Sequence, residues 1–146
     1  MRSPAGRWIH FGVTSYDIID TALGMMLRDS GDVLLASAKT LHAEIIRLSE
    51  AHKGTPMIGR THGIHAEPIT FGAKCASWAR ELERNIARLQ DARDEIAFGK
   101  ISGAVGIHAH ASPELEAKIC ARLGLSPEPI STQIINRDRH AHFLNV

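Results

Sequence analysis

The sequence is poor in aromatic residues, which make up 5% of its 146 residues, and its net charge at pH 7 is only +1. So small a charge argues against a broad surface for nucleic acid or for anionic lipid. No apolar run approaches the roughly 18 residues of a membrane span, and the N-terminus has no secretory signal pattern. We therefore expect a cytoplasmic protein that binds neither nucleic acid nor membrane.

Cysteine is also scarce. Cys75 and Cys120 stand far apart, without the spacing of a metal or redox motif, and both are expected to be buried free thiols. With 44% hydrophobic residues and few aromatics, the core must be aliphatic and rich in alanine. Such a composition is typical of a single soluble all-α domain.

Two long stretches carry apolar residues at helical spacing, and they predict helices over 14–53 and a long helix over 68–98. Thr14 with Asp17 three residues later is a capping-box pattern. The tripeptide Ser30–Asp32 either ends a first helix or is a weak point in one long helix. Both stretches show a heptad-like apolar seam, so they are expected to run antiparallel in a bundle.

The remaining segments are shorter. Ser112 as N-cap and Gly124 as stop predict a short helix over 112–124. The other expected segments of the 1–146 domain are an irregular lead-in at 1–13, a histidine loop at 54–67, a glycine loop at 99–111, a linker at 125–136 and the start of a truncated helix at 137–146.

The segment Gly59–Pro68 is the least generic part of the chain. Its glycines permit backbone angles that a Cβ would forbid, and Pro68 is expected to begin the following helix. His62 or His65 can transfer a proton near neutral pH. The alternative is an interhelical turn whose histidines are solvated or bonded to the backbone.

A second unusual segment, Gly99–Gly106, has three glycines at its start, middle and end. Such a backbone can come close to a ligand or to another chain. Its glycine spacing matches neither the P-loop nor the dinucleotide-binding fingerprint. The expected helix N-terminus at Thr14 and Ser15 offers free N–H groups and two hydroxyls, which suit an anion.

Several motifs together resemble the bacterial type of adenylosuccinate lyase, in the fumarase/aspartase superfamily. The likeness runs from about Trp8 to Phe143. The motifs that carry it are His10–Asp17, Asp20-Thr21, Gly59–Pro68, Gly99–Gly106, Pro127-Glu128-Pro129, Ser131-Thr132-Gln133 and Arg137–Ala141. The resemblance implies an all-α, long-helix bundle of the fumarase/aspartase type, a homotetramer whose glycine-rich loops carry the site.

The resemblance also implies a C–N lyase reaction without cofactor or metal. Adenylosuccinate would give AMP and fumarate, and the succinyl-carboxamide intermediate of purine biosynthesis would also release fumarate. His62 falls on the family's general acid. The positions that match substrate-binding residues are His10, Thr14, Ser15, Asp17, Thr61 and Gln133. Further supporting positions are His65, Lys100, Arg137 and Arg139.

The sequence also departs from this family. It contains no Gly-Ser-Ser-x-Met-Pro-x-Lys-x-Asn-Pro stretch, which carries the family's catalytic serine, and no match to the family's N-terminal and C-terminal domains. We therefore expect a central fragment, 1–146, that has no lyase activity by itself. The stretch Ile107–His110 is richer in histidine than is usual in the family.

Four other functions fit parts of the pattern. Argininosuccinate lyase and fumarase are the nearest enzymatic alternatives. A non-catalytic helical assembly module would use only the two seams. A metal-binding module would use the His-x-His pairs at 108/110 and 140/142, although no cysteine or carboxylate set completes a site at familiar spacing.

Overall fold

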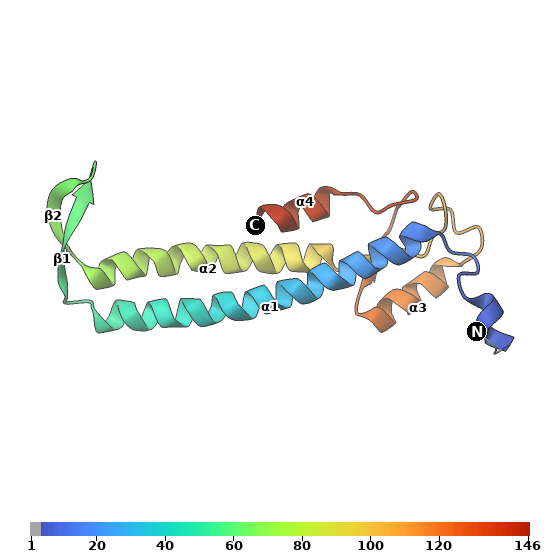
Figure 1. Cartoon of the computed structure of the whole chain (residues 1–146), viewed down its shortest axis with the longest axis horizontal. Helices are drawn as coiled ribbons and strands as arrows, with labels where there is room; N and C mark the ends of the chain where they lie inside the picture. Colours follow the sequence, from blue (N-terminus) through green and yellow to red (C-terminus); the bar gives the residue numbers. More distant parts are fainter. Residues whose placement is uncertain (1–3) are drawn as a thin grey trace. The chain divides into compact units, whose positions relative to one another are not determined.

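The computed structural model describes residues 4–146, and helices dominate it (Figure 1). The expectation of an all-α fold is confirmed, with two short β pairings added, each in a small two-stranded sheet. In chain order, the elements are a 3-10 helix at Pro4–Trp8, α1 Ser15–Ala51, β1 Pro56–Thr61, β2 Ile64–Thr70, α2 Phe71–Ile96, β3 Phe98–Gly99, α3 Pro113–Leu123, β4 Ser126–Pro127 and α4 Asp138–Asn145. Residues 1–3 of the expected lead-in lie outside the described residues.

The chain forms two compact units. Unit 1 comprises Met1–Gly31 and Ala92–Val146, and unit 2 comprises Asp32–Asp91. Helix α1 is unbroken at Ser30–Asp32, which decides between the two possibilities left open by the sequence. Gly31 is buried there, and a Cβ at this position would lie 2.8 Å from Arg93 Cγ. The glycine therefore serves close side-chain packing and does not end the helix.

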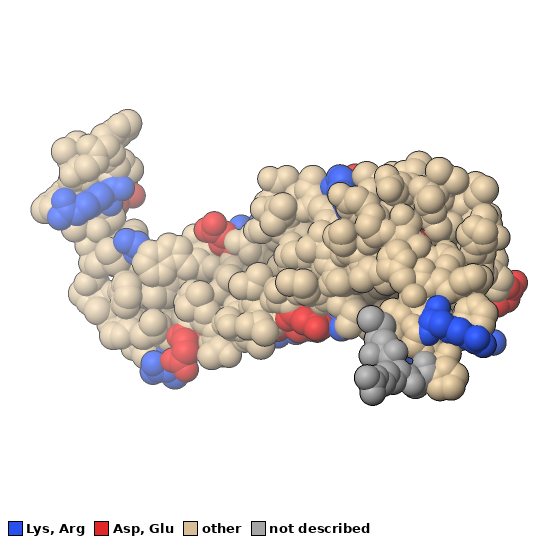
Figure 2. All heavy atoms as spheres, turned by 45° about the vertical axis from the view of Figure 1, so that its right-hand side comes forward, with Lys and Arg blue, Asp and Glu red and all other residues tan. Residues whose placement is uncertain are grey.

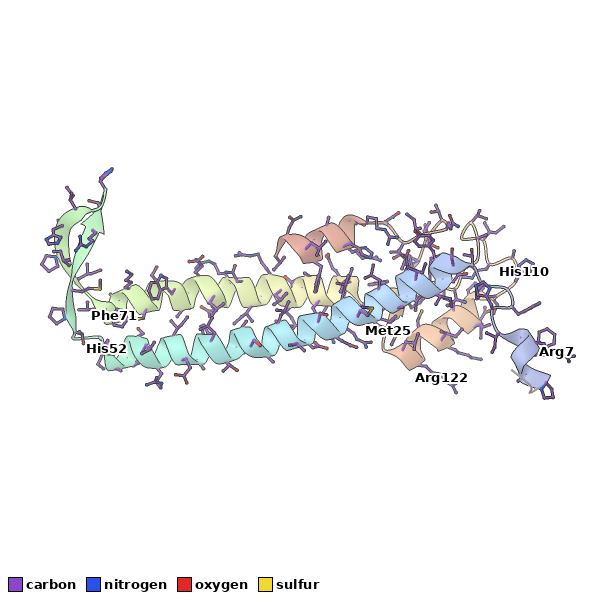
Figure 3. All side chains as sticks on the ribbon, in the orientation of Figure 1. Arg7, Met25, His52, Phe71, His110 and Arg122 are labelled. Atoms are coloured by element: carbon purple, nitrogen blue, oxygen red, sulfur yellow. The ribbon has the colours of Figure 1, made fainter. Side chains whose placement is uncertain are left out.

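In unit 2, parts of α1 and α2 lie side by side and run in opposite directions (Figure 1). Their joined end is held by the His52 and Phe71 rings, whose centroids are 5.2 Å apart (Figure 3). Ser49 Oγ donates to Gly72 O at 2.9 Å. Cys75 and Ala79 are fully buried between the helices. Small residues thus pack between the two helices, and alanine is among them, as the composition predicts.

The expected loop at 54–67 is corrected by the structure to an antiparallel β-hairpin, β1–β2. Pro68 lies within β2 opposite Ile58, and α2 begins only at Phe71. The two turn residues, His62 and Gly63, have φ values of 54° and 76°. Positive φ at both positions is the requirement of a type I′ turn, whose twist matches that of the paired strands.

In unit 1, the short helix α3 is confirmed together with both of its caps. The Ser112 side chain accepts a hydrogen bond from Leu115 N, and Gly124 adopts the left-handed conformation with φ 67°. Cys120 on this helix is free and buried. Burial, aided by the carboxylate of Glu116, raises the pKa of the Cys120 thiol to about 11, so this cysteine stays a protonated core residue.

The surface is not dominated by charge of one sign. On the face seen in Figure 2, acidic and basic groups are scattered among uncharged residues, and in places they adjoin one another. Within residues 4–146, no helix is both long enough and apolar enough to cross a membrane.

We predict that Gly24→Ala destabilises the chain by about 1–3 kcal/mol, as overpacking of a close contact does. A Cβ on Gly24 would lie 3.4 Å from Ile96 O and much closer to Phe98 O, which outweighs the better helix propensity of alanine. Gly54→Ala is the matched control, because no atom lies within 4 Å of its added Cβ. Urea denaturation that finds the two variants equally stable would contradict this packing.

Candidate active site

The segment from Lys100 to Ser102 is anchored residue by residue to other parts of unit 1. Lys100 N donates to Thr21 Oγ1 at 3.1 Å, and that hydroxyl donates to Lys100 O at 3.0 Å. Ile101 N donates to the buried Glu116 carboxylate at 2.5 Å. Ser102 Oγ lies 2.7 Å from Ser131 Oγ. This part of the predicted glycine loop is therefore a fixed platform.

A buried ion pair lies behind this platform. Lys100 Nζ is 2.5 Å from Asp17 Oδ1, and both side chains have no solvent exposure. Lys100 Nζ also donates to Gly103 O at 3.1 Å, while Gly103 N donates to Asp17 Oδ1 at 3.2 Å. The other Asp17 oxygen accepts from Thr14 N at 2.8 Å, which is the carboxylate contact that the capping box predicts.

A pocket of about 320 Å³, called the Thr14 pocket below, lies between the turn before α1 and the loop after Lys100. It is lined by Gly12, Val13, Thr14, Ser102, Gly103, Ala104, Val105, Ile107, Ala109 and His110. Thr14 thus lines a cavity, whereas Asp17 and Lys100 lie behind its walls. Nothing comes within 4 Å of a Cβ built on Gly103, which has φ 83°. At Gly103 the pocket wall is therefore formed by the backbone, with open space on the side where a Cβ would lie.

The two arginines that the resemblance assigns to the site form ion pairs with buried acids of unit 1. Arg137 lies 2.8 Å from Asp20, which also accepts from Ile135 N at 2.8 Å. Arg139 pairs with Glu128, and its guanidinium lies 3.8 Å from the centre of the Phe98 ring. Both arginines therefore hold the segment before α4 against the rest of unit 1.

Three other predicted residues of unit 1 are exposed. Ser15 is the first residue of α1, and Gln133 lies in the segment before α4. His10 has φ 70°, an uncommon backbone angle for a residue with a side chain. All three can be reached by a ligand from solvent.

The hairpin of unit 2 presents the remaining predicted residues. His62 occupies the turn between Thr61 and Ile64, and His65 pairs in register with Arg60. The side chains of Thr61, His62 and His65 are exposed. A second pocket, of about 490 Å³, is lined by Met57, Ile58, Gly59, Arg60, Ile69, Ala73, Lys74 and Ser77. The proton-transfer candidates and the Thr14 pocket thus belong to different units.

Several residues that organise unit 1 were not assigned to the site from the sequence. Asp20 and Thr21 are polar residues among the apolar residues that begin α1, and this position is a signal in the sequence that they have polar partners. Glu116 and Ser131 had no such signal, because their partners, Ile101 and Ser102, come from other segments.

One histidine of each His-x-His pair contacts another group of the chain. His108 Nδ1 lies 3.1 Å from Ala111 O, and His142 Nδ1 lies 2.7 Å from Glu95. Across residues 4–146, no group of three His, Cys, Asp or Glu side chains is arranged to hold a metal ion.

His140 predicts a pH dependence. Burial, and secondarily the Arg137 charge, lowers the pKa of His140, although the carboxylates of Asp20 and Asp138 oppose this. The unfolded state therefore binds a proton more readily, and stability is lost as pH falls from about 7 through the lowered pKa of the folded state. We expect His140→Gln to lose less unfolding free energy than wild type over that interval in urea titrations. Equal losses would contradict this role.

The chain resembles known lyases over nearly its whole length. A family model described as "Lyase" matches residues 2–146. The adenylosuccinate lyase of Thermotoga maritima is 48% identical over 95% of this chain and 32% of its own length. That of Synechocystis is 51% identical over 96% of this chain and 32% of its own length. The chain thus spans about a third of these relatives.

A solved structure shows the same fold. The fumarate lyase from Mesorhizobium sp. BNC1 superposes with a TM-score of 0.87 and 32% identity, over 98% of this chain and 34% of that protein. These findings confirm the resemblance to adenylosuccinate lyases and the fumarase/aspartase superfamily. The chain belongs to the lyase family that the matching model describes.

Proposed function

We propose that the chain is part of an adenylosuccinate lyase, which releases fumarate from adenylosuccinate to give AMP, and also from the succinyl-carboxamide intermediate of purine biosynthesis. The observation that carries this proposal is the identity of 48% and 51% to two adenylosuccinate lyases over 95% and 96% of the chain. The reaction is a β-elimination. A base removes a proton beside a carboxylate of the succinyl group, and an acid protonates the departing nitrogen.

His62 is proposed as that acid. Its imidazole is exposed at the turn of the hairpin, where a substrate can approach it without displacing core residues. An imidazole is well suited to donate a proton near neutral pH. Thr61, which is the last residue of β1, is proposed to help hold the substrate beside it. His65 is proposed as a supporting residue on the same hairpin.

The Thr14 pocket is proposed to receive a carboxylate of the succinyl group. The N-terminus of α1 supplies positive dipole density there, and Thr14 supplies a hydroxyl. Ser15, the exposed first residue of α1, is proposed to supply a second hydroxyl next to the pocket. His10 is proposed to lie near the nucleotide phosphate, and Gln133 to contact the substrate. Arg137 and Arg139 support these groups through their ion pairs with Asp20 and Glu128.

The complete site is proposed to form in a homotetramer. Unit 2 exposes large apolar side chains along its helices, with Leu34 51%, Leu41 53% and Trp78 46% exposed. Helices with such surfaces are stabilised by association with other helices. The sequence has no counterpart of the family's catalytic-serine stretch. The 146-residue chain alone is therefore proposed to be inactive. The protein is proposed to be cytoplasmic, to bind neither nucleic acid nor membrane, and to use no cofactor or metal.

The proposal is tested by complementation. The chain is co-expressed with a full-length adenylosuccinate lyase whose Thr-His histidine is replaced by glutamine, and loss of adenylosuccinate absorbance is followed. We expect no activity from either chain alone and activity from the mixed oligomer, because the fragment supplies His62. His62→Gln in the fragment should lower the activity of the mixed oligomer by about 10²-fold or more, because the general acid is lost.

His42→Gln on α1 is the matched control and should leave complementation intact. Activity on argininosuccinate or fumarate instead of adenylosuccinate would replace this proposal with the corresponding alternative lyase. A mixed oligomer without any lyase activity would leave the helical assembly module as the function of this chain. Activity of the fragment alone would overturn the proposed lack of a base.

A further inference from the structure

We propose that Asp17 is a positioning residue that joins the two walls of the Thr14 pocket, and that Lys100 holds it in that role. The resemblance assigned Asp17 to substrate binding. Its carboxylate is instead fully buried behind the pocket, with both oxygens engaged by the chain itself. This inference concerns the shape of the pocket, and its consequence for ligand binding rests on the proposed function.

Each oxygen of the Asp17 carboxylate holds a different wall. Oδ2 accepts a hydrogen bond from Thr14 N at 2.8 Å, on the turn that precedes α1. Oδ1 accepts one from Gly103 N at 3.2 Å, on the loop that faces this turn. Residues 12–14 and 102–105 line the pocket of about 320 Å³. One rigid carboxylate therefore sets the separation of the two segments.

Lys100 completes the clamp on Gly103. Its ammonium group binds Asp17 Oδ1 at 2.5 Å and Gly103 O at 3.1 Å. The N–H and the C=O of Gly103 are thus both held by this ion pair. The ammonium also compensates the charge of Asp17, so the carboxylate behind the wall does not repel an anion in the pocket.

Side-chain packing does not fix Gly103. No atom lies within 4 Å of a Cβ built on it, whereas Gly99 would meet Thr21 and Leu125 at 3.0 and 3.1 Å. Its φ of 83° lies in a region that glycine adopts readily. The position of this wall therefore depends on the hydrogen bonds to Asp17 and Lys100.

The test is a graded series of variants. Asp17→Asn/Lys100→Met is neutral and keeps one acceptor oxygen, while Asp17→Leu/Lys100→Met keeps none. Replacing a buried ion pair by groups of similar volume is often tolerated, whereas removing one partner leaves an unpaired buried charge. Both variants therefore change both residues. Asp29→Asn is the control, because this carboxylate on the same helix is exposed and contacts the adjacent Arg28.

The readout is amide hydrogen exchange of Thr14 and Gly103 in the 146-residue chain, followed by NMR. The amides of Leu125 and Ser126, bonded to Cys120 O and Ala97 O, report whether unit 1 stays folded. We expect about tenfold faster exchange at one of the two site amides in the asparagine variant, and at both in the leucine variant. The reference amides and the Asp29→Asn variant should be unchanged.

Site amides that keep wild-type exchange in both double variants would overturn the inference, as would unprotected site amides in wild type. If the leucine variant loses its reference amides, the asparagine variant alone decides, because it keeps one acceptor oxygen and buries no unpaired charge. Faster exchange at one of the two site amides then supports the clamp, and no change overturns it.

Fumarate titration into the same samples tests the consequence for binding. A wild-type chain that binds fumarate should lose about tenfold or more in affinity in the leucine variant, because the pocket wall moves. If fumarate does not bind wild type, the proposed carboxylate pocket fails. The exchange data then still decide the positioning role.

Discussion

The buried ion pair of Asp17 and Lys100 is the interaction on which unit 1 depends. Its partners are 83 residues apart in the chain and have no solvent exposure. Taking two charges out of water has a desolvation cost that offsets much of their attraction. Such a pair therefore contributes less to stability than to a single arrangement of the segments it joins, provided that the remaining hydrogen bonds of both groups are satisfied. Here those bonds reach Thr14 and Gly103, which line the same pocket. The ion pair thus connects the fold to the candidate site.

The other buried acids of unit 1 follow the same physical pattern. Asp20 and Glu116 each accept a hydrogen bond from the backbone of a distant segment, and Glu128 pairs with Arg139. A core with few aromatic residues leaves irregular segments without large side chains to pack against. Buried carboxylates instead satisfy the backbone groups of these segments, as the low dielectric of an interior requires. In the segment that leads into the pocket loop, the Glu116 and Asp17 carboxylates accept hydrogen bonds from Ile101 N and Gly103 N.

Unit 2 presents its candidate residue in a different way. His62 is held by the backbone of a two-residue turn, with strands on both sides and no burial of its side chain. A turn of this type fixes the direction of the hairpin end while leaving the imidazole accessible. Such a group is useful in catalysis only where other groups surround the substrate.

The sequence by itself determined the features that depend on neighbours a few residues apart. These include the helical stretches, the Thr14–Asp17 contact and both caps of α3, because helix periodicity and capping act within one or two turns. Its motifs also sufficed to identify the family. Only the tertiary structure decided that α1 continues through Gly31, where close packing accommodates the glycine, and that Lys100 is buried. The tertiary structure was also needed to find the β1–β2 hairpin and the Arg137–Asp20 ion pair, whose residues are 117 positions apart. Such contacts depend on which distant segments meet, and spacing along the chain does not encode that.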